Sequence, residues 1–572
     1  MDNRIQPAAF TNVPLISHDK ISKPDRPGID DKKEAVQDDS VSISARKSSG
    51  EKAGKMIKVS ILPQDPQVSP AVTVDFAQEK IGTGLSNDKI QVSDGSNPKA
   101  IPDLEGNYIY NVGTPQFDQV NAFCTVQRGF DMAEKYSGKP VKYAFSGKLS
   151  LLPHKQQGMN AYYSRNERSA NFFYFNSASL NKTVQTSESA DIVSHETAGH
   201  CKLDGDRPGW LGWDTETMSV HEAYSDYQAM MLALQDDSNI KLLLDQNGGD
   251  FKKESLLSRL GEEFGIAYHK DNTNPNDDNM QYLRNMINDF KYSNPDSLPD
   301  SNDHEVLTGE VHSFSRILSG ALYDILGMLY AKNLAGGAQS QKDALIAARD
   351  TLGPLTEKSI DLAPQSKCKY KDIALGLIKA DRLQNNGKNE REITDILTER
   401  NILTRDDIEA LNDHMSAIPS IRMKKAPATA QDVQKFLEKN GESLGIPDGI
   451  SMKLRDISSG KNGVTVNLDF SQEMDLNGKE YGKYDGHCVD VNGGLTLAFD
   501  KEGRLVDSVF DPITDDKKSD VKSGVLDCIG KDLIAEEGRS GSIFKTDTDI
   551  YQGVVVSTSE GKKKIVRIPV IS

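Results

Sequence analysis

Two histidines and one glutamate in the segment Ala190–Trp210 form the clearest chemical pattern in this chain. The sequence ADIVSHETAGHCKLDGDRPGW places Glu196 directly after His195 and a second histidine at His200. Neutral imidazole is a good zinc ligand, and two imidazoles on one helix face supply two corners of a tetrahedron. A glutamate beside the first histidine can take a proton from the metal-bound water without itself binding the metal. We therefore predict His195 and His200 as zinc ligands and Glu196 as the general base.

The five-residue separation of the two histidines constrains the helix that carries them. On a regular helix, a residue four positions later lies about 40° beyond a full turn, whereas one five positions later lies about 140° beyond it. A single π-bulge, with one i→i+5 turn, returns such a pair to one face, and these bulges concentrate at functional sites. Gly199, immediately before His200, makes the distortion easier to accommodate. The spacing thus predicts a locally widened helix.

A third ligand is expected from the next helical segment, SVHEAYSDYQAMMLAL. Glu222 follows His200 by 22 residues, and Asp226 comes four residues later on the same helix face. A carboxylate completes a His₂Glu set and leaves the fourth position open for water, as in catalytic zinc sites. Asp226 suits the role of hydrogen-bond acceptor for a ligand histidine, and Asp204 is a second candidate. His221 could compete as a ligand, but adjacent helical side chains do not share a face.

The wider pattern resembles that of the thermolysin-like (gluzincin) zinc peptidases. The sequence E-A-Y-S-D at 222–226, downstream of a His-Glu…His helix, resembles the E-A-x-S-D context of that family's ligand glutamate. Asp204 matches the family's aspartate four residues after the second ligand histidine. The resemblance runs from about residue 105 to 415 and implies a two-lobe catalytic domain. Its N-lobe would be rich in strands and its C-lobe helical, with the active-site helix between them.

Two further motifs extend the resemblance to substrate binding. The sequence N-A-Y-Y resembles the family's Asn-Ala-aromatic edge strand, which implies that Asn160 and Ala161 hydrogen-bond the substrate backbone. The sequence G-E-V-H-S resembles its Gly-x-Val-His segment, which implies that His312 stabilises the transition-state oxyanion. The aspartate expected five residues before this histidine is absent, so Asp303 or Glu305 would have to orient it.

Two features depart from the thermolysin-like pattern. The spacing in HETAGH is similar to the H-E-x-x-G-H of the dipeptidyl-peptidase III family, which offers a precedent for the spacing alone. No tyrosine lies between His200 and Glu222, where the thermolysin-like family has one. Trp210 and Trp213 occupy that loop, and an indole can donate a hydrogen bond but cannot act as an acid. These departures put catalytic efficiency in question.

Hydrophobic spacing predicts the elements that position these residues. The alternating stretches Ile57–Leu62 and Val72–Phe76 predict strands, and Phe117–Tyr136 predicts a helix that ends at Ser-Gly. Residues 141–180 alternate and are aromatic, which predicts a strand-rich lobe. From about 189 to 401 nearly every segment has helical spacing. Examples are Val220–Leu234, Val311–Asn333, Gln341–Leu352 and Ile393–Arg400. Strands followed by helices favour an α+β fold with a cleft between the lobes.

Composition shifts along the chain predict four regions. Residues 1–55 are expected to be a disordered tail, 56–104 an extended arm or short strands, 105–420 the catalytic domain, and 430–572 a smaller, β-rich α+β domain. In the last region, Ala430–Asn440 predicts a helix and two pairs of segments predict hairpins. The pairs are Leu495–Phe499 with Leu505–Phe510, and Val554–Ser557 with Ile565–Val570.

Bulk properties exclude some classes of function. The net charge of −17 argues against nucleic-acid binding, which needs clustered lysine and arginine. No apolar run approaches the roughly 18 residues that a membrane span requires, and no secretory signal is visible. The five cysteines are scattered and odd in number, which is no disulfide framework. We therefore expect a cytoplasmic protein, or one exported without a cleavable signal peptide.

The sequence as a whole predicts a zinc metallopeptidase, a hydrolase acting as an endopeptidase on a peptide or protein substrate. The alternative is a catalytically weak or inactive protein that keeps a peptidase fold and acts as a binding or effector module. A third possibility is a latent enzyme whose N-terminal segment covers the cleft. The C-terminal domain could bind a partner that the sequence does not identify.

Overall fold

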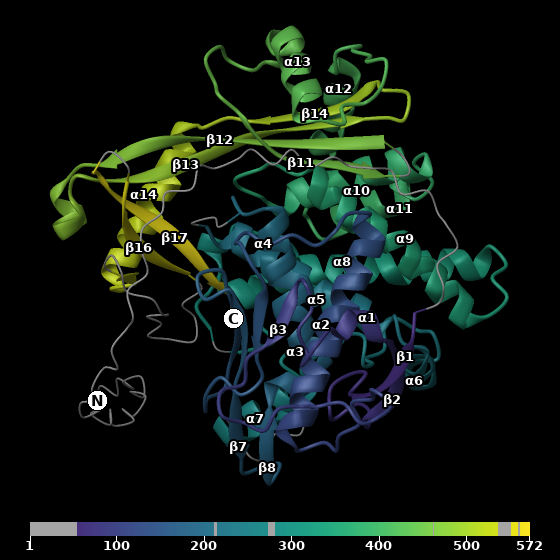
Figure 1. The fold of residues 1–572 in the computed structure, drawn as a ribbon. Coiled ribbons are helices and arrows are strands. Elements are labelled where there is room, and N and C mark those ends of the chain that lie inside the picture. The colour runs from purple at the N-terminus through teal and green to yellow at the C-terminus, as the bar shows by residue number, and fades with distance from the viewer. Residues whose placement is uncertain are drawn as a thin grey trace, which may run out of the picture. The chain divides into compact units, whose positions relative to one another are not determined.

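Strands come first along the chain and helices follow, with a second set of strands at the end (Figure 1). The computed structural model describes residues 54–210, 214–272, 281–301, 303–460, 463–535, 551–558 and 561–571. The fold is mixed α and β, which is consistent with the predicted α+β class. The tail predicted at residues 1–55 lies almost entirely outside the described residues.

The first strands form small sheets around one long helix. These elements are β1 (Met56–Ile61), β2 (Val72–Ala77), α1 (Gln78–Ile81), β3 (Ile90–Val92), α2 (Pro115–Ser137), β4 (Leu149–Leu152), β5 (Ala161–Ser164), β6 (Ser169–Phe172), β7 (Tyr174–Ser177) and β8 (Lys182–Gln185). Strands β1 and β2 pair antiparallel, as do β7 and β8. The remaining strands lie in the order β5-β6-β4-β3, with β5 antiparallel to β6. The two early strands and the strand-rich segment at 141–180 are thus confirmed.

Helix α2 connects the strands to the helical part of the chain. Thr114 accepts a hydrogen bond from the Phe117 backbone at 3.3 Å, and the helix ends at Gly138, whose φ of 71° suits glycine. One set of its buried side chains packs with the strands, and a second set, which includes Tyr136, packs with the later helices. The predicted helix with its Ser-Gly end is therefore confirmed.

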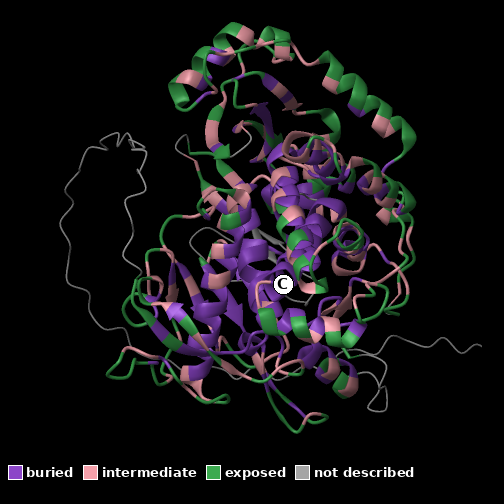
Figure 2. Cartoon of the chain, turned by 90° about the vertical axis from the view of Figure 1, so that its right-hand side faces the viewer, coloured by how far each residue is buried: buried purple, intermediate pink, exposed green. Residues whose placement is uncertain are grey.

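Helices dominate residues 190–417. They are α3 (Ala190–Ser194), η2 (His195–Cys201), α4 (Lys202–Asp206), α5 (Thr215–Ala233), α6 (Asp237–Asn247), α7 (Glu262–Asn272), α8 (Val311–Ala335), α9 (Gln341–Leu362), α10 (Tyr370–Asn385), α11 (Glu390–Glu399) and α12 (Arg405–Ala417). Two short strands, β9 (Arg259–Leu260) and β10 (Arg284–Asn285), pair antiparallel among them. Figure 2 shows that much of the ribbon in the interior is buried. The four helices predicted from the sequence are confirmed as α5, α8, α9 and α11, and each begins within five residues of its predicted start. Helix α9 continues ten residues beyond its predicted end.

The last region carries long strands covered by two helices. Its elements are α13 (Ala430–Asn440), β11 (Lys453–Gly460), β12 (Gly463–Leu476), β13 (His487–Phe499), β14 (Leu505–Asp511), α14 (Asp515–Gly530), β15 (Ile534–Ala535), β16 (Tyr551–Ser557) and β17 (Lys563–Ile571). This region also contains the short 3₁₀ helices η4 (Glu442–Leu444) and η5 (Lys479–Tyr484). Two others, η1 (Thr186–Glu188) and η3 (Pro295–Ser297), lie earlier in the chain. The β13–β14 and β16–β17 pairings confirm both predicted hairpins, and α13 has the predicted bounds.

The C-terminal strands contact the rest of the described chain at several points. The Gln365 side-chain amide, after α9, donates to Asn467 at 2.9 Å and to Thr496 at 2.6 Å. Strand β17 pairs with both β13 and β5 and so links the two sets of strands. Residues from Gly54 onward form one compact unit, and the boundary expected near residue 420 stays a prediction. Among the described residues, no helix is both long and apolar enough to span a bilayer.

Candidate metal centre

The two histidines lie on a continuous helical segment that widens at its middle. Residues His195–Cys201 form a π-helix between α3 and α4. The predicted widening is thus confirmed, and it extends over seven residues rather than one bulge. Its consequence is that both imidazoles face α5, although they are five residues apart.

Three ligand atoms converge between this π-helix and α5. The Nε2 atoms of His195 and His200 lie 3.0 Å apart. The Glu222 carboxylate places one oxygen 3.3 Å from the first nitrogen and the other 3.4 Å from the second. All three residues are buried, with exposed fractions of 4%, 0% and 1%. Tetrahedral zinc with ligands at 2.0–2.1 Å has ligand–ligand separations of about 3.3–3.4 Å, so this triad has the dimensions of a metal site.

Unsatisfied polar atoms at the triad also fit a bound cation. Neither Glu222 carboxylate oxygen has a hydrogen-bond partner, although both are buried. Within the described residues, the nearest cationic or imidazole groups to this carboxylate lie 3.3–3.9 Å away, and a buried carboxylate is stabilised further by a positive charge in direct contact. A metal ion held by His195, His200 and Glu222 would supply that charge. The group can therefore hold a metal ion.

Asp226 orients the first histidine, as the sequence suggested. Its Oδ1 atom lies 3.0 Å from the Nδ1 atom of His195. This contact holds the imidazole with its Nε2 atom directed at the other two ligands. Burial raises the Asp226 pKa, but the charge of Arg284 and the hydrogen bond with His195 outweigh burial and lower it. The carboxylate is thus kept ionised.

Arg284 is a site residue that the sequence analysis missed. Its guanidinium donates to both Asp226 oxygens, with Nη2–Oδ1 at 2.7 Å and Nε–Oδ2 at 3.0 Å, and lies 3.9 Å from Glu222. The residue comes from β10, 58 positions after Asp226, and no local spacing connects the two in sequence. Arg316, on α8, has a different role: its guanidinium donates to the Val306 carbonyl at 2.9 Å and holds the loop before α8.

Glu196 lies beside the triad without belonging to it. Its side chain is buried, and its Oε2 atom has no hydrogen-bond partner. The Glu196 pKa is raised to about 8, mainly because the side chain is buried. The positive charge of His195 and a hydrogen bond with the Tyr163 backbone oppose this rise without cancelling it. A carboxylate with a raised pKa can take up a proton near neutral pH, which a general base requires.

His312 approaches the triad from the first turn of α8. Its Nε2 atom lies 3.6 Å from Glu222, and its Nδ1 atom lies 2.6 Å from Glu310. Burial lowers the His312 pKa, but the charges of Glu310 and Glu222 outweigh it and raise the pKa to about 10. The expectation that Asp303 or Glu305 orients this histidine is corrected here. Glu310 does so, because as N-cap of α8 it is held by the Ser313 amide at 2.9 Å.

Asp204 does not contact a ligand histidine, which corrects the second candidate for that role. Its carboxylate accepts hydrogen bonds from the Tyr163 hydroxyl at 2.7 Å and from Arg165 Nε at 2.9 Å. Within the part of the chain that the structure describes, His200 Nδ1 has no hydrogen-bond partner. The physical reason is that Asp204 lies on the side of α4 that faces β5. Its hydrogen bond with Tyr163 connects that strand to the helical segment that carries the two histidines.

His221 and Trp210 lie outside the group of three candidate ligands. The His221 ring stacks against that of His200 with centroids 6.0 Å apart, so it is packed beside a ligand without being part of the triad. Trp210 is fully buried and donates to the Pro364 carbonyl at 2.7 Å. Trp213 lies outside the described residues.

The predicted substrate residues lie at and just before the start of β5. The Asn160 carbonyl accepts from the Phe173 backbone at 3.2 Å, and Ala161 pairs with Phe172 of β6. Farther along β5, Tyr163 and Ser164 also pair with β17. The structure therefore brings β5 to the site, and substrate binding by Asn160 and Ala161 stays a prediction.

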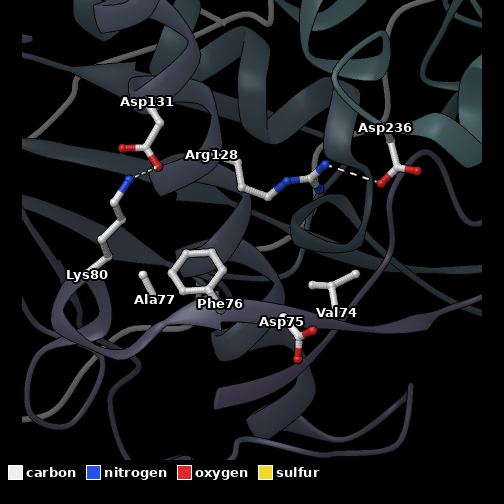
Figure 3. A pocket seen from close by; sticks show the side chains of 8 residues that line it. All are labelled: Val74, Asp75, Phe76, Ala77, Lys80, Arg128, Asp131 and Asp236. Atoms are coloured by element: carbon white, nitrogen blue, oxygen red, sulfur yellow. Dashed lines mark hydrogen bonds and ion pairs between the residues drawn. The ribbon is translucent and has the colours of Figure 1, made fainter. Parts of the chain in front are cut away.

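A separate open cavity of about 340 Å³ lies between β2, α1 and α2 (Figure 3). Its charged side chains are already paired, with Lys80–Asp131 at 2.7 Å and Arg128–Asp236 at 3.4 Å. None of the triad residues lines it. The cavity is therefore distinct from the candidate metal centre and presents mainly compensated charge.

Comparison with known proteins does not place the chain in a family. No protein-family model matches the sequence, and no curated protein matches it significantly. The argument for function thus depends on the geometry of the site.

Proposed function

We propose that the chain is a zinc-dependent peptidase that hydrolyses peptide bonds with a metal-activated water. The observation that carries the proposal is the convergence of His195, His200 and Glu222, with Glu196 on the same helix but outside the ligand set. Such an arrangement leaves a coordination position open, as catalytic zinc sites do. The order of strands, active-site helix and later helices supports a thermolysin-like pair of lobes.

The donor set favours zinc over calcium and magnesium. Two imidazoles and one carboxylate are poor ligands for calcium or magnesium, which prefer oxygen donors in larger number. The two imidazole Nε2 atoms are 3.0 Å apart, and each has one of the two Glu222 oxygens at 3.3–3.4 Å, distances close to the edges of a zinc tetrahedron. Bound zinc would lower the pKa of its water ligand and polarise the scissile carbonyl.

Each neighbouring side chain has a role that its position supports. Glu196 takes a proton from the attacking water and passes it to the leaving amine. His312, protonated because of its raised pKa, donates a hydrogen bond to the developing oxyanion. Arg284 holds Asp226 and thereby His195, and its guanidinium is 17% exposed, so it can also contact a substrate carbonyl.

The test compares metal content with hydrolysis in three purified variants. Glu196→Gln is expected to keep one zinc per chain and to lose at least about 10³-fold in kcat, because the general base is gone while the ligands remain. His200→Ala is expected to lose the metal. His414→Ala, whose side chain is 43% exposed, is the matched control and should keep both zinc and activity. Zinc retained by His200→Ala, or zinc lost from Glu196→Gln, would contradict these roles.

A second candidate, a binding or effector module with a weak or inactive site, is favoured by one observation. Strand β17 already pairs with β5 beside the site, and a permanently blocked site would be inactive. The test measures zinc content and cleavage of a broad peptide library, both for the full chain and for a chain that lacks the last residues of β17. One zinc per chain without cleavage in either protein would support this alternative.

A further inference from the structure

The last residues of β17 reach beyond the hairpin that contains them. Within the described residues, strand β16 pairs with β17 from Lys563 to Pro569. Val570 and Ile571 continue past β16 and pair antiparallel with Ser164 and Tyr163 of β5. Figure 1 shows β17 running toward the strands that lie beside the active-site helix. The end of this strand therefore makes a pairing that its own hairpin does not require.

Strand β5 is in direct contact with the proposed catalytic machinery. The Tyr163 backbone forms a hydrogen bond with the carboxylate of Glu196. The hydroxyl of Tyr163 also donates to Asp204 at 2.7 Å, on the helical segment that contains the metal ligands. Because paired strands lie about 5 Å apart, the backbone of Ile571 is one strand spacing from the residue that contacts Glu196.

An extended peptide at this site would need the same edge of β5. A strand has two edges, and one edge of β5 is paired with β6 over all four of its residues. A peptide that adds to a sheet makes main-chain hydrogen bonds along the remaining edge. At Tyr163 and Ser164, β17 already occupies that edge. Substrate and β17 thus cannot pair with these two residues at once.

We propose that β17 is an autoinhibitory strand, with Val570 and Ile571 occupying the edge of β5 at Ser164 and Tyr163, which continues the edge predicted to bind substrate at Asn160 and Ala161, so that an extended peptide cannot pair along the whole strand. This inference rests on the proposed peptidase function and concerns the regulation of its site. A tethered segment competes at an effective concentration of about 1 mM. A strand whose own dissociation constant for this edge is about 0.1 mM would therefore raise the KM of a substrate about tenfold, and release of the strand would activate the enzyme.

The hairpin has other attachments, so its last residues can be removed without removing the hairpin. Lys564 pairs with Cys488 of β13, and its side chain lies 2.8 Å from Asp490. Strand β16 additionally pairs with β15. A chain shortened by residues 570–572 loses the β5 pairing and retains the ladder between β16 and β17. A chain shortened by Ser572 alone keeps both paired residues and is the matched control.

The first experiment measures hydrolysis of fluorogenic peptides by the full chain and the two shortened chains, all loaded with zinc. Removal of 570–572 is expected to raise kcat/KM about tenfold, mainly through a lower KM, because substrate no longer competes with the tethered strand. Removal of Ser572 alone should leave kcat/KM unchanged. A synthetic peptide with the sequence KKIVRIPVI (residues 563–571) should inhibit the 570–572 deletion competitively and the full chain less.

A binding measurement separates failure of this inference from failure of the proposed function. The fluorescently labelled peptide KKIVRIPVI is titrated into Glu196→Gln forms of the full chain and of the 570–572 deletion. Binding at least about tenfold tighter to the deletion supports the occupied edge, even if neither chain hydrolyses any peptide. Equal binding to both, or equal kcat/KM in two active chains, would overturn the proposal.

Discussion

We predict that Gly199→Ala, which adds one methyl group, moves His200 on η2 away from Glu222 on α5. A Cβ atom built there would lie 2.4 Å from Ser225 Oγ and 2.6 Å from Ser225 Cα. An ordinary van der Waals contact needs at least 3.4 Å, so the π-helix and α5 would have to separate by about 1.0 Å (3.4 minus 2.4). Rotation of the serine side chain cannot relieve this clash, because a backbone atom is also too close.

The separation would act on both stability and metal binding. Overpacking costs about 1–3 kcal/mol, and alanine regains about 1 kcal/mol of helix propensity, so we expect Gly199→Ala to lower the unfolding free energy by about 1 kcal/mol. The distance between His200 and Glu222, now 3.4 Å, would grow to about 4.4 Å. This exceeds the separation of about 3.3 Å in a zinc tetrahedron, and zinc affinity should fall about 10–100-fold.

The assays are chemical denaturation of the metal-free protein and competition for zinc against a chelator of known affinity. Gly530→Ala is the control, because Gly530 ends α14 with no atom of the described residues within 4 Å of the added methyl; it should leave zinc affinity unchanged and raise the unfolding free energy by at most about 1 kcal/mol. An unchanged unfolding free energy together with an unchanged zinc affinity in Gly199→Ala would refute the close approach of η2 and α5.

Two other predictions concern carboxylates near the site. Asp226→Asn removes the charge that holds His195 and Arg284, and zinc affinity measured by chelator competition should fall about 10–100-fold; an unchanged affinity would contradict the orienting role. Burial, together with the charge of Asp118, raises the Glu188 pKa from 4.5 to about 8. Between these pH values the unfolded chain has released this proton and the folded chain has kept it, so stability falls as pH rises, by up to about 1.4 kcal/mol per pH unit. Glu188→Gln should flatten the decline in unfolding free energy between pH 5 and pH 8, and an equally steep decline would show that other groups cause it.

The sequence alone determined the features that depend on local geometry. The spacing of His195 and His200 requires a widened helix, because the rotation per residue of a regular helix places them on different faces, and the π-helix is present. Phe117–Tyr136, Ala430–Asn440 and the hairpin segments were predictable for a similar reason. The spacing of hydrophobic residues, helix caps and turn residues determine secondary structure over a few neighbouring residues. In these segments, tertiary contacts did not change the secondary structure that this local pattern predicts.

The sequence also predicted the three residues that the structure brings together as a possible metal site, and it predicted Asp226 beside them because Glu222 and Asp226 are four residues apart on one helix and thus share a face. It could not identify the partners that come from distant elements. Arg284 lies on a two-residue strand far along the chain from Asp226, and no periodicity connects them. Glu310 orients His312 because of its place at the N-cap of α8, a boundary that sequence spacing locates only to within a few residues.

Only the tertiary structure decided what surrounds the active-site helix. Asp204 turns toward Tyr163 and Arg165 because α4 packs against β5. The pairing of β17 with β5 joins segments about 400 residues apart, and strand registers over such separations depend on the whole fold rather than on local pattern. The sequence thus specified the buried His195, His200 and Glu222 group and the helix that carries the two histidines, whereas packing decided which groups orient these side chains and which strand lies beside Glu196.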